Sequence, residues 1–310
     1  MPLITVIIPT FNRATLVGAT VRSALDQDFS DYEVIVVDDG STDDTQVVLA
    51  TFGDKIRVLK HENSGLGASR NYGLREARGE YVALLDDDDI WFPWTLSVYA
   101  TAICENQSPW LVSSRGVDFI NAANLPTPPT GELIFRFFKD FYSSSGLSYW
   151  ATPSGVAFRT EEARGAGGFF EHPYGQEEND LWLRMGDKKG FVIIDKPVCF
   201  GRRIHDMNIS SFSNRNLLGT RYIIDQELSA KYPGIGTRDR ERRDILTSHI
   251  RGVSLSCIRL QHHVDAWELY RRTFRWHVEL KRWRYLLAFP LLSWAKMTVK
   301  FFSVTNTTKL

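Results

Sequence analysis

The stretch "YVALLDDDDIW", residues 81–91, places an apolar run directly before four consecutive aspartates. The run has the composition of a β-strand that is covered on both faces. Neighbouring carboxylates repel one another, and burying them is unfavourable unless a cation or hydrogen-bond donors compensate their charge. The stretch therefore predicts a buried strand that ends at a site for a positively charged group.

Three more apolar runs precede this strand, and helical patterns separate them. The runs are "LITVIIPTF", "EVIVVDD" and "IRVLK". The helical patterns are "ATLVGATVRSALDQ", "STDDTQVVLATF" and "GLGASRNYGLREARG". Apolar strands that alternate with helices are typical of an α/β fold, in which helices cover both faces of a largely parallel sheet.

The composition is that of a folded globular protein. Of 310 residues, 43% are hydrophobic and 24% are charged, which argues against a disordered or fibrous chain. Cys104, Cys199 and Cys257 are far apart in the sequence, so we expect no disulfide framework and a reducing, cytoplasmic setting. The N-terminus lacks a basic segment before its apolar run, and no long uninterrupted apolar stretch occurs. We therefore expect neither a signal peptide nor a clean transmembrane span.

Acidic residues follow two of these strands, where a parallel sheet binds its ligands. If the strand geometry continues past Leu85, Asp86 and Asp88 point to one side, and Asp87 and Asp89 to the other. Carboxylate oxygens suit Mn²⁺ or Mg²⁺, so the first pair predicts a metal site, with a solvated acidic loop as the alternative. We expect Asp87 to be a spacer and Asp89 to accept local backbone hydrogen bonds.

Together, the motifs resemble those of family 2 glycosyltransferases over residues 3–210. In order along the chain they are "VIIPTFNR", "VVDDGSTDDT", "NSGLGASRNYGL", "LLDDDDIW", "GVAFRTEEARGAGGFFE" and "GQEENDLWLRM". The resemblance implies a GT-A fold, a Rossmann-like mixed sheet flanked by helices. It also implies a glycosyltransferase domain at residues 1–213, with a nucleotide-sugar-binding half (1–109) and an acceptor half (110–213).

The resemblance also implies which residues bind the donor. The residues expected near the nucleotide are Pro9, Thr10, Asp38, Asp39, Arg70, Asn71 and Asp86, with Asp38 in a less direct role. Asp88 is the expected principal metal ligand, with Asp86 and His205 as further candidates. By themselves, Gly65 and Gly67 are only a weak indication of a phosphate-binding loop.

The catalytic base is where this sequence departs from the family. Relatives commonly have Glu-Asp before "xDLWLR", whereas this chain has Glu177 and Glu178. Glu178 takes the position of the usual aspartate and is the expected base, with Glu177 as second candidate and Asp180 as third. The alternative is a cluster of acids that only stabilises a helix N-terminus.

The implied activity is inverting transfer of a hexose, with Mn²⁺ or Mg²⁺, from a nucleotide-diphosphate sugar. UDP-sugars are the commonest donors in the family. The acceptor would be a hydroxyl of a cell-surface glycan, a polysaccharide or a lipid-linked glycan, and we expect no nucleic-acid partner. A non-catalytic nucleotide-sugar-binding module is one alternative. A nucleotidyltransferase is another, although no basic triphosphate loop follows the first strand.

The C-terminal segment, residues 214–310, has helical patterns and is basic. Residues 235–310 contain 15 Lys or Arg against 6 Asp or Glu, a formal charge of +9. The stretch "KRWRYLLAFPLLSWAKMTVKFF", residues 281–302, predicts either a helix on an anionic membrane surface or a packed helical pair. Pro290 should kink or break it. In the first case the protein would lie at the inner face of the cytoplasmic membrane.

Overall fold

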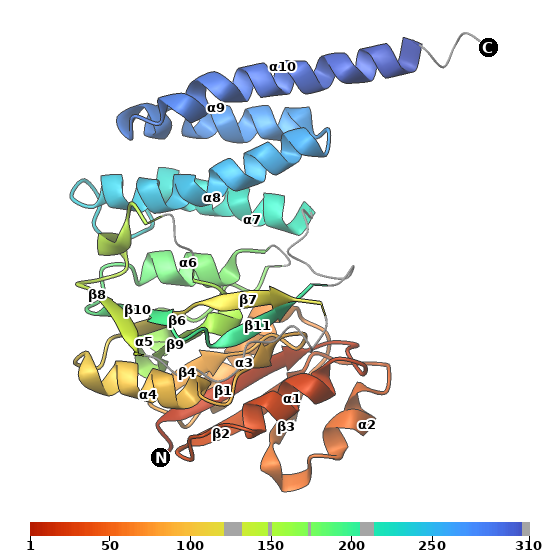
Figure 1. Cartoon of the computed structure of the whole chain (residues 1–310), viewed down its shortest axis with the longest axis vertical. Coiled ribbons are helices and arrows are strands. Elements are labelled where there is room, and N and C mark those ends of the chain that lie inside the picture. Colours follow the sequence, from red (N-terminus) through yellow and green to blue (C-terminus); the bar gives the residue numbers. More distant parts are fainter. Residues whose placement is uncertain (121–131, 148–150, 173–174, 205–213, 306–310) are drawn as a thin grey trace. The chain divides into compact units, whose positions relative to one another are not determined.

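Figure 1 shows the fold of the chain, which is a computed structural model. It describes residues 1–120, 132–147, 151–172, 175–204 and 214–305. Its contacts divide the chain into two compact units, which are described separately. The first unit comprises Met1–Ser143, Ala151–Pro173 and Glu177–Asn208, and the second comprises Ser144–Trp150, Tyr174–Gln176 and Ile209–Leu310. The boundary predicted at residue 213 lies outside the described residues.

The first unit is built on an eight-stranded sheet with the order β3-β2-β1-β4-β9-β6-β10-β8. The first four strands in this order, from β3 to β4, are parallel, as the alternating strands and helices predict. β9 then runs antiparallel between β4 and β6, and β8 runs antiparallel to β10, so the sheet is mixed. The strands are β1 (Ile4–Thr10), β2 (Tyr32–Asp38), β3 (Arg57–Lys60), β4 (Tyr81–Leu84), β6 (Leu111–Ser114), β8 (Ile134–Phe138), β9 (Val156–Arg159) and β10 (Phe191–Lys196).

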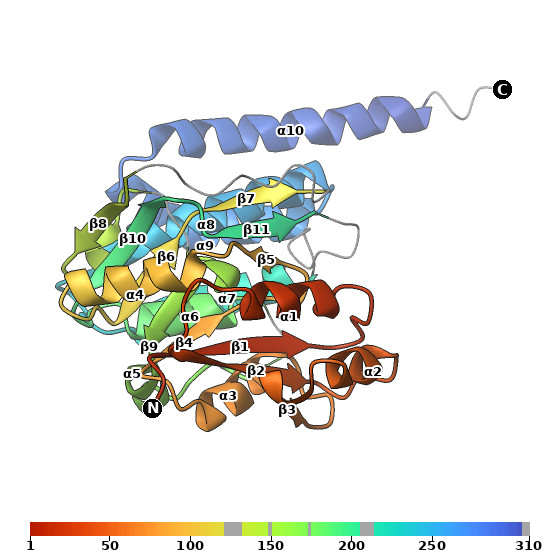
Figure 2. The same ribbon diagram turned by 60° about the horizontal axis from the view of Figure 1, so that its bottom comes forward.

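Helices cover both faces of this sheet. In Figure 2, α1 (Val17–Leu25) lies above β1 and α3 (Leu66–Glu76) lies below it. β1 is buried along its whole length because its alternate side chains enter the cores on the two faces. The other helices of this unit are α2 (Thr45–Ala50), α4 (Thr95–Glu105), α5 (Thr160–Gly165) and α6 (Glu177–Arg184). The predicted α/β class with a mixed sheet is confirmed.

A second, three-stranded sheet lies beside the end of β4. It has the order β5-β11-β7, with β5 at Ile90–Trp91, β11 at Phe200–Arg203 and β7 at Gly116–Phe119. β5 begins immediately after the four aspartates and pairs antiparallel with β11. This sheet therefore links the aspartate stretch to a segment more than a hundred residues later in the chain.

The second unit is helical, which confirms the predicted helical C-terminal region. Its helices are α7 (Asn214–Leu228), α8 (Asp239–Arg259), α9 (His263–Glu279) and α10 (Trp283–Thr305). The helical pattern of residues 265–289 is divided between α9 and α10. The break lies where Lys281 adopts a left-handed conformation with φ 56°, which a regular α-helix does not tolerate. Among the described residues, no helix is long and apolar enough to cross a membrane.

Pro290 lies within α10 and does not end it. A proline has no N–H, so it cannot donate to the carbonyl four residues earlier, that of Leu286. The hydroxyl of Tyr270, on α9, donates to this carbonyl at 2.9 Å and supplies the missing hydrogen bond. The helix thus continues through the proline because a neighbouring helix satisfies the exposed acceptor.

Candidate active site

The carboxyl ends of β1, β2 and β4 meet at one edge of the sheet, as predicted. Thr10 pairs with Asp38 across β1 and β2, and the Leu85 N–H donates to the Ile7 carbonyl at 3.1 Å. The loops that follow β1 and β2 are tied together by Asn12. Its side-chain oxygen accepts the Thr42 N–H at 2.8 Å. The polar side chains after these strands therefore share one region of the first unit.

The four aspartates form a turn, and this corrects the predicted strand-like alternation. β4 ends at Leu84, and the Asp89 N–H donates to the Asp86 carbonyl at 3.1 Å. A hydrogen bond across three residues is that of a β-turn, so the four side chains do not alternate between two faces.

Asp89 is the buried anchor of this turn, with 4% of its surface exposed. One carboxylate oxygen accepts the Ser154 hydroxyl at 2.6 Å, and the other accepts the Arg203 N–H at 3.0 Å. Burial raises the pKa of Asp89 to about 8, and the neighbouring Asp86 adds to the shift. Asp89 does accept a backbone N–H, but from β11 and not from its own turn, so the predicted local bonding is wrong.

Asp86 contacts the buried guanidinium of Arg70, on α3, whose exposed surface is 1%. Arg70 Nη2 donates to Asp86 at 3.0 Å, while Nη1 lies 3.4 Å from Glu177 and 3.3 Å from Glu178. Burial raises the pKa of Asp86 to about 6, although the charge of Arg70 opposes the shift. One arginine thus joins the aspartate turn to both glutamates that the sequence identified as base candidates.

Asp87 and Asp88 both face Arg13, which directly follows the loop residue Asn12. Arg13 Nε lies 3.7 Å from Asp87, and its Nη2 lies 3.9 Å from Asp88. Their side chains are similarly covered, with 12% and 15% of the surface exposed. Burial raises the pKa of Asp87 to about 7, and the charge of Asp88 contributes. The spacer role of Asp87 stays a prediction.

Asp38 and Asp39 hold the loops around the site. Asp38 is fully buried, and its oxygens accept the Ser41 N–H and the Gln46 amide, each at 2.8 Å. Asp39 accepts the N–H groups of Ser64 at 2.8 Å and Gly65 at 3.0 Å. Both carboxylates therefore shape the loops at this edge. Direct contact with a nucleotide base, predicted mainly for Asp39 with Pro9 and Thr10, remains untested.

Asn71 is committed to the loop that follows α5. Its amide donates to the Phe169 carbonyl at 2.7 Å and to Glu171 at 2.8 Å, so both of its N–H groups are used. On the same helix, a Cβ on Gly67 would lie 2.1 Å from the Phe170 carbonyl oxygen. Close packing against this loop explains Gly67 without a phosphate. Nucleotide contact by Asn71 stays a prediction.

Asp180, the third base candidate, is 1% exposed and accepts the guanidinium of Arg184 at 2.7 Å. Arg184 also donates to the carbonyls of Ala166 and Gly168. This network holds α6 against the loop after α5. Asp180 thus has a structural role in this network, and its role as a base stays a prediction.

Residues 5–156 match the sequence profile of the family described as "Glycosyl transferase family 2". The chain carries a family 2 glycosyltransferase domain. This confirms the resemblance drawn from the motifs.

Two relatives are similar to part of this chain. The GalNAc(5)-diNAcBac-PP-undecaprenol beta-1,3-glucosyltransferase of Campylobacter jejuni is 44% identical over 94 residues, covering 29% of this chain and 30% of the relative. The putative teichuronic acid biosynthesis glycosyltransferase TuaG of Bacillus subtilis is also 44% identical over 94 residues, covering 29% and 37%. The aligned segments thus span 30% and 37% of the lengths of these two relatives.

The fold of the chain resembles a solved structure over most of the length of the chain. The Staphylococcus aureus TarS fragment 1–349, in complex with UDP-GlcNAc, superposes with a TM-score of 0.69 at 20% identity. The match covers 89% of this chain and 80% of TarS 1–349. At this identity the likeness establishes the fold alone.

The acidic turn of the glycosyltransferase domain offers ligands that suit a hard divalent cation. Asp86 and Asp88 supply carboxylate oxygens, and burial, together with the nearby charges of Asp88 and Glu178, raises the pKa of Asp86 although Arg70 opposes the shift. Within the described ranges, no group of three His, Cys, Asp or Glu side chains could hold a metal ion. Two carboxylates fit a site whose remaining ligands come from a substrate diphosphate. His205 lies outside the described residues.

Three residues of the site were missed or only partly identified from the sequence. Ser154 joins two aspartates, since it donates to Asp89 and accepts the Asp86 N–H at 3.1 Å. Arg203, on β11, donates to the Asp88 carbonyl at 3.1 Å. Arg13 was recognisable as a cation at a strand end, but its acidic partners were not.

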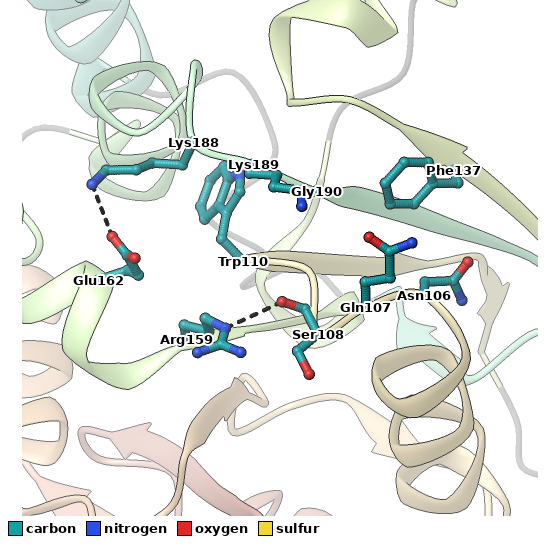
Figure 3. A pocket seen from close by; sticks show the side chains of 10 residues that line it. All are labelled: Asn106, Gln107, Ser108, Trp110, Phe137, Arg159, Glu162, Lys188, Lys189 and Gly190. Atoms are coloured by element: carbon teal, nitrogen blue, oxygen red, sulfur yellow. Dashed lines mark hydrogen bonds and ion pairs between the residues drawn. The ribbon is translucent and has the colours of Figure 1, made fainter.

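A cavity of about 190 Å³ lies elsewhere in the first unit (Figure 3). Trp110 and Gly190 precede β6 and β10, so the cavity lies where these parallel strands begin, opposite the edge that carries the aspartates. Lys188 pairs with Glu162 across it at 2.9 Å. The cavity is therefore separate from the acidic turn. Its lining residues are Asn106, Gln107, Ser108, Trp110, Phe137, Arg159, Glu162, Lys188, Lys189 and Gly190.

Proposed function

We propose that this chain is an inverting glycosyltransferase that transfers a hexose from a UDP-sugar to an acceptor hydroxyl. The observation that carries the proposal is the position of Arg70, which joins Asp86 at the donor edge to Glu177 and Glu178 on α6. Donor-binding and proton-accepting groups then lie on either side of one guanidinium. This is the arrangement that a single displacement between two substrates requires.

The names of the similar proteins support the substrate classes. The Campylobacter relative is named for a polyprenyl diphosphate-linked acceptor, and the Bacillus relative for teichuronic acid biosynthesis. The TarS structure contains UDP-GlcNAc. We therefore propose a UDP-sugar donor and an acceptor that is a cell-surface glycan, a polysaccharide or a lipid-linked glycan, with the enzyme in the cytoplasm.

The donor would bind over the carboxyl ends of β1, β2 and β4. In the proposal, Pro9, Thr10 and Asp39 line the base pocket, while Asp38 and Asn71 support the surrounding loops. Asp88, with Asp86, would hold Mn²⁺ or Mg²⁺, and this ion, when bound, would supply positive charge near the leaving diphosphate. Arg70 would keep the Asp86 carboxylate in place throughout.

Glu178 is the proposed base, because its side chain is 17% exposed whereas that of Glu177 is 4% exposed. A base must reach the acceptor hydroxyl, so the more accessible carboxylate is better suited. Glu178 would take the hydroxyl proton as the acceptor oxygen forms a bond to the anomeric carbon. The bond from that carbon to the diphosphate breaks with its electron pair on the departing oxygen, and attack from the opposite side inverts the configuration.

The test is to measure sugar transfer by Glu178→Gln, Glu177→Gln and Asp88→Asn with a panel of UDP-sugars and Mn²⁺. Loss of a general base commonly slows a reaction by about 10²–10⁴-fold, so Glu178→Gln should lose transfer and still bind UDP. Glu177→Gln is the matched control, since it removes a neighbouring carboxylate. Full turnover by Glu178→Gln would refute the assigned role. Binding of UDP-sugars with no transfer to any acceptor would instead favour the non-catalytic module.

A further inference from the structure

Helix α10 of the second unit has one face that packs against α8 and α9. The Tyr285 hydroxyl and Ser254 on α8 form a hydrogen bond at 2.7 Å. The rings of Phe289 and Tyr270 stack with centroids 4.4 Å apart. Trp267 on α9 donates to Ser293 at 3.0 Å. These contacts recur about every turn and fix which side of α10 faces the rest of the unit.

The opposite face of α10 is also apolar, and it is exposed. At 3.6 residues per turn, Trp283, Leu287, Leu291 and Trp294 fall on one stripe, on the side away from the buried residues. Their exposed surfaces are 53%, 70%, 68% and 66%. No charged residue occurs between positions 285 and 295. A surface helix normally carries polar side chains on its outer face, so this stripe is typical of a helix that has a partner.

The charge around the stripe indicates which partner. Residues 281–310 contain six Lys or Arg and no Asp or Glu. Lys281 and Arg284 are exposed near the start of the helix. A second copy of the chain would bring the same positive charges to the contact, whereas an anionic surface would be attracted to them. Tryptophan with lysine and arginine beside an apolar stripe is the composition of helices that lie in the membrane interface.

We propose that the outer face of α10, defined by Trp283, Leu287, Leu291 and Trp294, docks on the surface of an anionic lipid bilayer. The apolar side chains enter the boundary between headgroups and acyl chains, and the basic residues lie among the headgroups. The helix lies in the interface and does not span it. The proposal does not depend on glycosyl transfer, so either one can fail alone.

Vesicle co-sedimentation of the full chain tests the apolar part of the proposal. The vesicles are phosphatidylcholine alone, or equal parts of phosphatidylcholine and phosphatidylglycerol. The unmodified chain should bind the anionic vesicles, and Leu287→Glu with Leu291→Glu should weaken binding by about 100-fold, since each buried leucine contributes about tenfold or more. The matched control is Leu228→Glu with Ile235→Glu, which changes two exposed side chains outside α10 and should leave binding within about twofold.

Neutralising the cations tests the electrostatic part. Lys281→Gln and Arg284→Gln should each weaken binding to the anionic vesicles by about fivefold and leave the small binding to neutral vesicles unchanged. The proposal is overturned if the unmodified chain binds neither vesicle, or if the control variant loses as much binding as the α10 variant. It is also overturned if light scattering shows a dimer that Leu287→Glu with Leu291→Glu dissociates, without vesicle binding.

Discussion

Replacing Arg70 by methionine should destabilise the first unit and separate the two halves of the candidate site. Arg70 is 1% exposed and lies 3.0–3.4 Å from carboxylate oxygens of Asp86, Glu177 and Glu178. Methionine fills much of the same space but leaves these carboxylates without their shared cation. The change therefore tests the charge of Arg70 more than its volume.

The magnitude follows from the burial of the partners. Removing one member of a buried ion pair destabilises a protein by about 3–5 kcal/mol, because the remaining charge is left uncompensated. The side chains of Asp86 and Glu178 are 33% and 17% exposed, so water can solvate them in part. We therefore expect about 3 kcal/mol, at the lower end of this range. Arg70→Lys should lose less stability than Arg70→Met but more than none, because one ammonium cannot donate in two directions as a guanidinium does.

Hydrogen exchange of the α6 and β4 amides is the appropriate assay, because a chain with two units need not unfold in one step. In Arg70→Met, these amides should exchange about 100-fold faster, which corresponds to about 3 kcal/mol. Arg57→Met is the control, since Arg57 is 30% exposed and its ion pair with Glu33 lies in the same unit. If Arg70→Met exchanges no faster than Arg57→Met, the guanidinium does not hold the site together.

Three other predictions can be checked directly. Asp87→Asn should retain most sugar transfer and Asp88→Asn should abolish it; equal losses in an activity assay would show that the two residues, which share Arg13, act as one. Tyr270→Phe should lower the stability of the helical unit by about 1–3 kcal/mol in chemical denaturation, because the Leu286 carbonyl loses its donor; an unchanged midpoint would contradict this. His277 is fully buried, and burial with Arg282 and Arg251 nearby lowers its pKa from 6.5 to about 3. The folded state resists protonation of His277, so the unfolded state binds this proton first as the pH falls below 6.5. The contribution of neutral His277 to the free energy of unfolding is therefore complete above pH 6.5 and falls by about 1.4 kcal/mol per pH unit toward pH 3. His277→Phe should remove this part of the pH dependence of thermal unfolding; the same slope with and without the histidine would exclude it.

The parts of the fold that sequence predicted are those determined by local pattern. β1, β2 and β4 are apolar runs, and their polar ends meet because parallel strands end at the same edge. Glu177 and Glu178, before "xDLWLR", were named as base candidates through the resemblance to the family, and this role stays a prediction. In each case a short stretch of sequence contained the information.

The parts that were wrong or missed depend on residues far apart in the sequence. The aspartates form a turn and not a continued strand, because Asp89 is anchored by Ser154 and by β11. β5 has two residues, which is too short a pattern to recognise without its partner strand. Lys281 divides α9 from α10 although lysine itself favours helices. Tertiary contacts determined each of these features.

The proline in α10 also limits how this helix can move. Pro290 frees a single carbonyl, that of Leu286, and the Tyr270 hydroxyl of α9 occupies it. If α10 slid along α9 by one turn, about 5.4 Å, the hydroxyl would meet a carbonyl already bonded within the helix. The hydrogen bond between the Tyr270 hydroxyl and the Leu286 carbonyl therefore forms in only one register of α9 against α10. Rotation of α10 about its axis would also break the hydrogen bond between Tyr270 and the Leu286 carbonyl. This bond therefore fixes the direction in which the apolar stripe of α10 faces.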